Sequence, residues 1–190
     1  MMADAPYLSL VEPWDREEPR ELANTRIFTL RQRRARSRTQ PDKEGDFVYL
    51  ETGDWVNVIA LTEDDQVVLI EQYRHGVDEV TLEIPGGMVD EGESALQAGL
   101  RELTEETGFG GDAPQIIGRV SPNPAIMTNW CHTILVEGVS LRGAPSPDGT
   151  EEVGVRLVAL SEIPAQIRSG VIHHAMVVAA FHHLAIRAAT

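Results

Sequence analysis

Two apolar segments joined by a short polar link most constrain how this chain can fold. They are WVNVIAL at 55–61 and QVVLIEQYR at 66–74, with TEDD between them. Their β-branched and apolar residues favour strands, and the polar link favours a hairpin. Because apolar residues follow one another almost without interruption, the pattern predicts central strands buried within the fold.

The remaining segments predict a mixed α/β sandwich around this hairpin. Further strands are expected at 79–85, 115–121, 129–141 and 152–160. Helices are expected at 94–107, 161–170 and 173–188. Since strands and helices do not alternate regularly, the order disfavours a doubly wound parallel sheet.

The first 51 residues differ in composition from the rest and predict an N-terminal extension rich in β structure. Residues 1–24 contain several prolines and acids, and we interpret them as mostly irregular. Segments 26–38 and 45–51 predict a hairpin with polar residues at its turn. We therefore expect a small subdomain at 1–51 and the main domain at 52–190.

Charge and composition exclude several classes of function. The net charge of −14 argues against binding to nucleic acid, but a bound cation would still allow a phosphorylated substrate. The chain has one cysteine, Cys131, and no apolar run of about 18 residues that would span a membrane. The first residues lack the features of a signal peptide, so a cytoplasmic location is expected.

The helix expected at 94–107 has clear start and stop signals. Ser94 is a good N-cap, Gln97 completes a capping box, and Gly108 suits a left-handed C-cap. Its apolar stripe consists of Leu96, Leu100 and Leu103.

Three acids near the end of this helix are the first candidates for a functional site. Glu102 and Glu106 share one face, and Glu105 flanks them. They repel one another and oppose the helix dipole, which is consistent either with a solvated acidic face or with a site for Mg²⁺ or Mn²⁺. Pro85-Gly86-Gly87 precedes the helix and could turn a carbonyl toward the same cation.

The spacing of these residues resembles the Nudix box. Gly87, then Glu93 after five residues, then 101–109 after seven more, match every defined position. The resemblance implies a Nudix α/β/α sandwich and cation-dependent hydrolysis of a nucleoside diphosphate linked to another group. It also implies that Glu93 and Arg101 pair and brace the loop against the helix.

The same resemblance implies roles for individual residues. Glu102 and Glu106 would bind Mg²⁺ or Mn²⁺, Glu105 would be a further or bridging ligand and a catalytic residue, and Gly86 would contribute its carbonyl. The catalytic base would come from DGTEEVGVRL at 148–157, where the apolar pattern favours Glu151 over Glu152. The alternative is that these two acids only solvate a loop.

The flanking motifs resemble those of ADP-ribose and nucleoside-diphosphate-sugar pyrophosphatases. EQYRHG at 71–76 and LEIPGG at 82–87 carry this likeness, which implies that Arg74 contacts the substrate phosphates. A salt bridge at the strand end is the alternative for Arg74. Gly86 departs from the ADP-ribose pattern, in which alanine is usual at this position.

Two further residues are candidates for substrate binding. Arg33 represents a cluster of arginines in the extension, which could contact substrate or simply solvate an edge strand. Trp55 could stack on a base or pack in the core.

In similar enzymes the extension packs across a homodimer, so a homodimer is expected. The histidine pairs at 173–174 and 182–183 do not predict a metal site.

The expected activity is hydrolysis of the pyrophosphate bond of a nucleoside diphosphate sugar. ADP-ribose is the leading candidate, and the products would be a nucleoside monophosphate and a sugar phosphate. One alternative is a Nudix hydrolase of dinucleoside polyphosphates or oxidised nucleotides. Another is a non-catalytic domain that senses nucleotide sugars, although such domains typically lose the box acids that this chain keeps.

Overall fold

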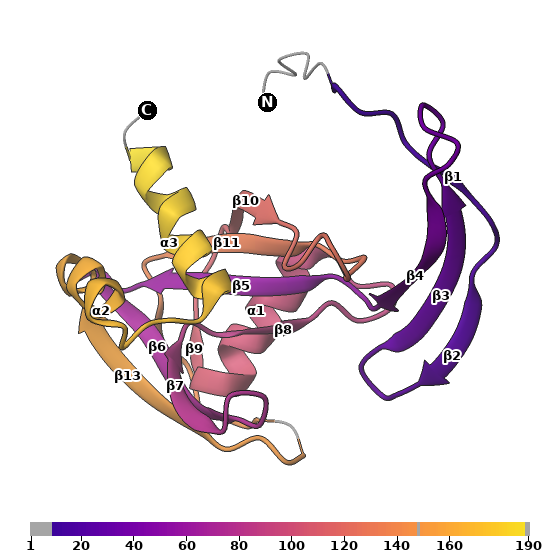
Figure 1. The fold of residues 1–190 in the computed structure, drawn as a ribbon. Coiled ribbons are helices and arrows are strands. Elements are labelled where there is room, and N and C mark those ends of the chain that lie inside the picture. The colour runs from indigo at the N-terminus through magenta and orange to yellow at the C-terminus, as the bar shows by residue number, and fades with distance from the viewer. Residues whose placement is uncertain (1–8, 148, 189–190) are drawn as a thin grey trace. The chain divides into compact units, whose positions relative to one another are not determined.

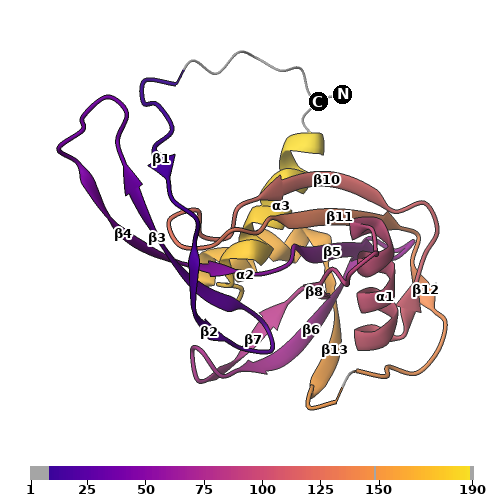
Figure 2. The same ribbon diagram turned by 90° about the vertical axis from the view of Figure 1, so that its right-hand side faces the viewer.

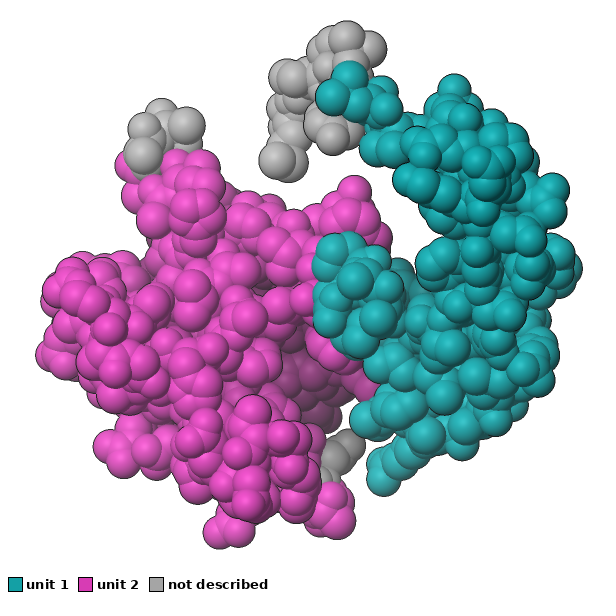
Figure 3. Space-filling view, in the orientation of Figure 1, with its two compact units in different colours: residues 1–52, 123–128 teal, residues 53–122, 129–190 magenta. Residues whose placement is uncertain are grey.

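The computed structural model describes residues 9–147 and 149–188. The chain divides into two compact units, which Figure 3 distinguishes by colour. Unit 1 comprises residues 1–52 and 123–128, and unit 2 comprises residues 53–122 and 129–190. Within the described residues, no helix is long and apolar enough to cross a membrane.

Unit 1 is built around an antiparallel sheet with β3 (Thr29–Arg36) at its centre (Figure 1). β4 (Glu44–Glu51) pairs with β3 along its whole length, which confirms the expected hairpin. β1 (Asp15–Arg16) and β2 (Arg20–Asn24) share the other edge of β3. The expectation that residues 1–24 are mostly irregular is therefore wrong for β2. All five residues of β2 are exposed, so backbone pairing and not an apolar pattern makes it a strand.

Unit 2 contains a mixed sheet in the order β10-β11-β5-β6-β13. The bounds of these strands are β10 (Gln115–Val120), β11 (Cys131–Glu137), β5 (Trp55–Leu61), β6 (Gln66–Arg74) and β13 (Val153–Ala159). β11 runs parallel to β5, and the other neighbours in this order are antiparallel. Both expected central strands have the predicted bounds.

The β5–β6 hairpin opens soon after its turn. The two strands pair only at Leu61 and Val67. Beyond that point β8 (Gly86–Met88) pairs with β5, and β7 (Glu79–Glu83) pairs with β6. The chain from β7 to β8 therefore crosses between the diverging strands and leads directly into the helix that follows.

Two short strands complete unit 2 and correct one expectation. β9 (Phe109–Gly110) pairs with β12 (Ser140–Leu141). The strand expected over 129–141 is thus divided into β11 and β12. Gly138 lies between them with a φ of 67°, a left-handed conformation that breaks the extended chain.

Helices cover both faces of the sheet in unit 2, which confirms the predicted sandwich (Figure 2). α1 (Ala95–Thr107) packs on one face through a cluster that includes Val56, Val58 and Ile134. α2 (Ile163–Ser169), preceded by the 3₁₀ turn η1 (Leu160–Glu162), and α3 (Ala175–Ala188) pack on the other face. Alternate residues of β5 and β11 supply the two clusters, which explains their unbroken apolar sequences.

The caps of α1 are formed as the sequence predicts. The Ser94 side chain accepts a hydrogen bond from the Gln97 amide, and the Gln97 side chain accepts one from the Ser94 amide. Gly108 adopts a φ of 72° and donates its amide proton to the Thr104 carbonyl. These contacts fix both ends of the helix that carries the three acids.

Candidate active site

The acidic helix end lies directly against the glycine segment that precedes the helix. Glu106 is 2% exposed, and its Oε2 accepts a hydrogen bond of 2.9 Å from the Gly86 amide. Gly87 lies so close to Glu102 that a Cβ on this glycine would stand 2.3 Å from Oε1. Glycine at 87 is therefore required for the carboxylate to occupy its place.

Gly86 is also held tightly, but by the neighbouring strand. A Cβ at this position would stand 2.2 Å from the Val56 carbonyl oxygen. Alanine, which is usual at this position in the ADP-ribose pattern, would therefore clash here, because β8 pairs closely with β5. The backbone of Gly86 keeps the groups that could serve a ligand.

Buried like charges dominate the electrostatics of this helix end. Burial raises the pKa of Glu106 to about 8 despite the Gly86 hydrogen bond, and the charges of Glu102 and Glu151 add to the rise. Burial also raises the pKa of Glu102, although Arg101 opposes this.

Arg101 links the loop, the helix and two of the acids. Its Nε and Nη2 donate to the two oxygens of Glu93 at 3.1 and 3.0 Å, which confirms the expected pair. Nη2 also donates to the Met88 carbonyl at 3.0 Å. Nη1 donates to Glu102 at 2.8 Å and to Glu105 at 3.2 Å. The guanidinium thus braces the loop and partly neutralises the outer acids, but it makes no hydrogen bond with Glu106.

Arg74 at the end of β6 is held by a buried carboxylate on β7. Its Nε and Nη2 donate to Oε1 and Oε2 of Glu83, both at 2.8 Å. Glu83 is 2% exposed and also accepts from the Thr81 hydroxyl at 2.6 Å. The pair with Glu83 raises the pKa of Arg74 more than burial lowers it, and the charges of Glu106 and Glu151 add to the rise. The guanidinium therefore lies within electrostatic reach of the acidic helix end.

Glu151 lies in the segment before β13, and its charge affects the pKa values of the helix acids and of Arg74. Its charge contributes to the raised pKa values of Glu102, Glu106 and Arg74. Glu152 is not among the leading influences on any of these three groups. Glu151 thus lies within electrostatic reach of the helix acids and of Arg74, and its role as the catalytic base stays a prediction.

Trp55 and Arg33 occupy different surroundings. Trp55 begins β5, is partly buried and pairs with Met88, next to the glycine segment. Arg33 lies in unit 1, where its guanidinium stacks 4.4 Å from the centre of the Tyr49 ring and donates to the Tyr49 hydroxyl. A pocket of about 380 Å³ within unit 1 is lined by Arg33, Tyr49, Trp14 and Phe47 among others.

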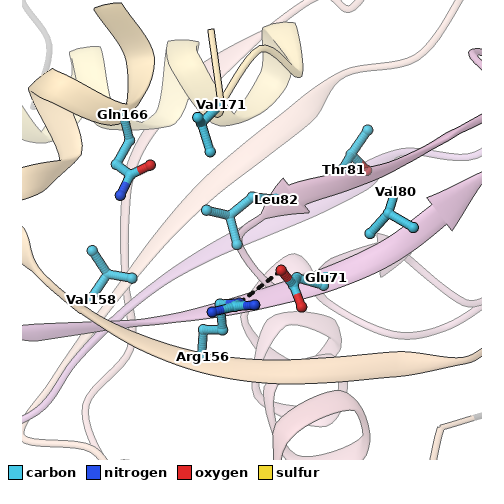
Figure 4. Close-up of a pocket in the computed structure, with 8 residues that line it drawn as sticks. All are labelled: Glu71, Val80, Thr81, Leu82, Arg156, Val158, Gln166 and Val171. Atoms are coloured by element: carbon cyan, nitrogen blue, oxygen red, sulfur yellow. Dashed lines mark ion pairs between the residues drawn. The ribbon is translucent and has the colours of Figure 1, made fainter. Parts of the chain in front are cut away.

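A second pocket, of about 260 Å³, lies elsewhere in unit 2 (Figure 4). β6, β7, β13 and the region of α2 form its walls, which include Val80, Leu82 and Val158. An ion pair of 2.7 Å between Glu71 and Arg156 crosses one end. None of the residues expected in the active site lines this pocket, so it is separate from the acidic helix end.

The residues at the helix end fit a hard divalent cation by their chemistry. Carboxylate and carbonyl oxygens are the ligands that such ions prefer. Glu106 is buried and has no cationic hydrogen-bond partner in the described part of the chain. Within residues 9–147 and 149–188, however, no three side chains already converge as a finished metal cage. Arg101 holds oxygens of Glu102 and Glu105, so a cation would compete with it.

Sequence reasoning did not assign roles to Glu83 and Thr81. Glu83 belongs to the LEIPGG motif, so a signal was present, but its partners were not identifiable. The pairing of β6 with β7 brings Arg74, Thr81 and Glu83 together. Only the strand register shows that the buried carboxylate serves the arginine.

Fold and site together define an α/β/α sandwich that holds a buried, carboxylate-rich helix end within reach of an arginine. Residues 51–181 match the NUDIX domain, and the chain belongs to this family. It is a pyrophosphohydrolase, and enzymes of this family generally use divalent metal ions.

Two relatives and one solved structure illustrate the range of similar proteins. A "Methanol dehydrogenase activator" of Bacillus methanolicus is 30% identical over 135 residues, which are 70% of this chain and 73% of the relative. An "ADP-ribose pyrophosphatase" of Bacillus subtilis is 28% identical over the same length and the same shares. A crystal structure of an "ADP compounds hydrolase" superposes with a TM-score of 0.81 at 19% identity, over 93% of this chain and 95% of that chain. This last likeness shows the fold.

Proposed function

We propose that this Nudix hydrolase cleaves the pyrophosphate bond of a nucleoside diphosphate sugar, with ADP-ribose as the leading candidate. The products are a nucleoside monophosphate and a sugar phosphate. The observation that carries the proposal is the placement of Arg74, fixed by Glu83, within electrostatic reach of Glu106 and Glu151. An arginine fork suits phosphate oxygens, and the nearby carboxylates suit a metal-assisted attack on phosphorus.

The names of similar proteins support the same substrate class. The Bacillus subtilis relative is named for ADP-ribose, and the solved structure is named for ADP compounds. The flanking motifs EQYRHG and LEIPGG point in the same direction.

The acids and Gly86 form the proposed metal-binding group. Glu102 and Glu106 supply carboxylate oxygens, Glu105 is a further or bridging ligand with a part in catalysis, and Gly86 supplies its carbonyl. A bound Mg²⁺ or Mn²⁺ would neutralise charge on the phosphate oxygens and lower the pKa of the attacking water. The amide of Gly86 holds Glu106 in place by the hydrogen bond of 2.9 Å.

Three other residues act on the substrate. Arg74 binds phosphate oxygens through the donors that Glu83 does not use, and so orients the pyrophosphate. Glu151 accepts the proton of the water that attacks phosphorus. Trp55, partly exposed at the start of β5, stacks on the base.

Unit 1 has a role in assembly under this proposal. The chain forms a homodimer, and the extension at 1–51 contributes to it, with Arg33 as a substrate contact. Arg33 lines the pocket of about 380 Å³ in unit 1, so its side chain borders a space open to a ligand. Light scattering tests the assembly: a mass of twice 20.9 kDa supports the homodimer, and a mass of 20.9 kDa contradicts it.

A product assay tests the function. The purified chain is incubated with Mg²⁺ or Mn²⁺ and with ADP-ribose, GDP-mannose, UDP-glucose, dinucleoside polyphosphates or nucleoside triphosphates. We expect monophosphate release to be fastest from a nucleotide sugar. Fastest release from a dinucleoside polyphosphate or a nucleoside triphosphate would contradict the nucleotide-sugar proposal and identify that compound class as the substrate. Binding of nucleotide sugars without turnover of any compound would identify a sensor instead.

A further inference from the structure

His174 stands beside the carboxylate that holds the proposed phosphate-binding arginine. It immediately precedes α3, on a part of the chain far from β7 in sequence. Its Nδ1 lies 3.7 Å from Oε2 of Glu83. Nδ1 is buried and has no hydrogen-bond partner among the described residues. A buried ring nitrogen without a partner costs free energy, and the carboxylate of Glu83 is the acceptor that could satisfy it.

The two oxygens of Glu83 are not equally satisfied. Oε1 accepts from Arg74 Nε at 2.8 Å and from the Thr81 hydroxyl at 2.6 Å. Within residues 9–147 and 149–188, Oε2 accepts one hydrogen bond, of 2.8 Å, from Arg74 Nη2. Each carboxylate oxygen can accept two hydrogen bonds, and the side chain of Glu83 is only 3% exposed to water. Oε2 therefore has room for a second donor on the side where His174 stands.

The proton on His174 must lie on the nitrogen that faces Glu83. Burial lowers the pKa of His174 more than the charge of Glu83 raises it, which favours the neutral ring. A neutral ring carries one proton, and a lone pair on Nδ1 would face a buried carboxylate and be repelled. The Nδ1–H tautomer removes this repulsion. A separation of 3.7 Å is longer than a hydrogen bond, and such contacts often tighten when a ligand binds.

We infer that His174 is a positioning residue for phosphate binding: its Nδ1–H fixes Glu83, and Glu83 fixes the guanidinium of Arg74. The side-chain hydrogen bonds of Arg74 within the described residues use Nε and Nη2. Nη1 is left for substrate phosphate, and its direction depends on the carboxylate behind it. The inference rests on the proposed function in one respect, the role of Arg74 toward phosphate. It adds α3 to the elements that shape the site.

His173 provides a matched control beside His174. Its Nε2 lies 3.0 Å from Oε1 of Glu79, which is on the surface, and its Nδ1 contacts the Gly170 carbonyl at 3.1 Å. Among the described residues, His173 forms no hydrogen bond or ion pair with Glu83 or Arg74. Replacing His173 therefore changes a neighbouring histidine of the same segment without altering the support of the arginine.

Two replacements of His174 separate a donor from simple packing. Asparagine places an amide N–H near the position of Nδ1, whereas leucine fills space without a donor. We expect His174→Leu to raise KM for the nucleotide sugar about tenfold and to change kcat little, because Arg74 loses binding energy common to substrate and transition state. His174→Asn should keep KM within about threefold, and His173→Leu should leave both constants unchanged.

NMR gives a second readout that needs no substrate. The Nε–H signal of Arg74 should be protected from solvent exchange in the wild type and in His174→Asn. In His174→Leu its exchange should be faster by about tenfold, at unchanged thermal stability. The ¹⁵N shifts of His174 should report the Nδ1–H tautomer.

The outcomes separate this inference from the proposed function. Equal KM values for His174→Leu and the wild type, with equal protection of Arg74, would overturn the positioning role. Equal losses in His174→Asn and His174→Leu would also overturn it, because packing alone would then explain both. If the wild type hydrolyses no nucleotide sugar, the proposed function fails. The exchange data still decide whether His174 fixes Arg74.

Discussion

Arg74 stands opposite Glu79 in the register of β6 and β7, yet its guanidinium binds Glu83, four residues further along β7. The side chain therefore extends back along the paired strands and does not point into solvent at the end of β6. Two parallel hydrogen bonds of 2.8 Å fix its orientation. Arginine has the length and the fork that this geometry requires, and lysine could not replace it.

The buried pair makes stability depend on pH through Glu83. Burial raises the pKa of Glu83, but hydrogen bonds from Arg74 and Thr81 lower it more, so the folded value lies below 4.5. The ionised carboxylate thus stabilises the fold above about pH 4.5, and this contribution is lost as pH falls through the folded pKa. We expect Glu83→Gln to lower the free energy of unfolding by about 2 kcal/mol near neutral pH.

Urea unfolding at about pH 7 and about pH 3.5 measures this difference. The gap between the wild type and Glu83→Gln should narrow at the lower pH, because the wild-type carboxylate is then becoming protonated. Glu79→Gln serves as a control, since its partner His173 forms a contact at the surface. A gap of equal size at both pH values would show that Glu83 does not stabilise the fold through its charge.

Gly87→Ala should reduce activity more than stability. The added Cβ would stand 2.3 Å from Glu102 Oε1, and the carboxylate must move because it is the free end of a side chain. We expect kcat to fall by about tenfold to a hundredfold, while the free energy of unfolding changes by about 1 kcal/mol or less. Steady-state kinetics and thermal unfolding measure the two effects.

Gly76→Ala is the matched control, because a Cβ on this glycine meets nothing within 4 Å and its φ is not in the left-handed region. It should leave both activity and stability unchanged. If Gly87→Ala is as active as Gly76→Ala, the position of Glu102 is not critical for turnover.

The elements that sequence predicted best are those in which several local signals agree. Apolar β-branched residues and a polar turn defined β5 and β6 with their correct bounds. Cap residues defined α1 in the same way. By contrast, β8 has the sequence GGM, which carries no strand propensity, and only its pairing with β5 makes it a strand.

In the candidate site too, local sequence signals predicted some contacts, whereas others depend on tertiary packing. The three acids of α1 and the glycines before it are close in sequence, so their spacing alone indicated a common site. The support of Arg74 by Glu83 depends on the register of two strands, and the approach of His174 depends on where α3 begins. Local patterns contain no information about such contacts, because tertiary packing creates them.

Glu106→Gln should abolish most turnover and leave the fold intact. The amide removes a proposed metal ligand, and we expect kcat to fall by about a hundredfold to a thousandfold. Without added metal, stability near neutral pH should be unchanged or higher by about 1 kcal/mol, because the raised pKa of Glu106 forces the folded chain to bind a proton that the unfolded chain does not hold, and glutamine removes this cost. Product release and thermal unfolding test both parts.

The exposed Glu91 gives the control Glu91→Gln, which should resemble the wild type. Full activity of Glu106→Gln would refute a role for this carboxylate in metal binding.

Divalent cations should stabilise the wild type through the same carboxylate. Ligand binding at about a hundred times Kd adds about 2.7 kcal/mol to the free energy of unfolding, or roughly 5–10 °C in Tm for a chain of this size. A net charge of −14 means that any salt will also stabilise the chain by screening, so the comparison needs NaCl of equal ionic strength. The excess shift with Mg²⁺ or Mn²⁺ should vanish on chelation and should be lost in Glu106→Gln but kept in Glu91→Gln. An equal shift in both variants would place the stabilising ion away from α1, because Glu106 is the acid that this helix end buries most completely.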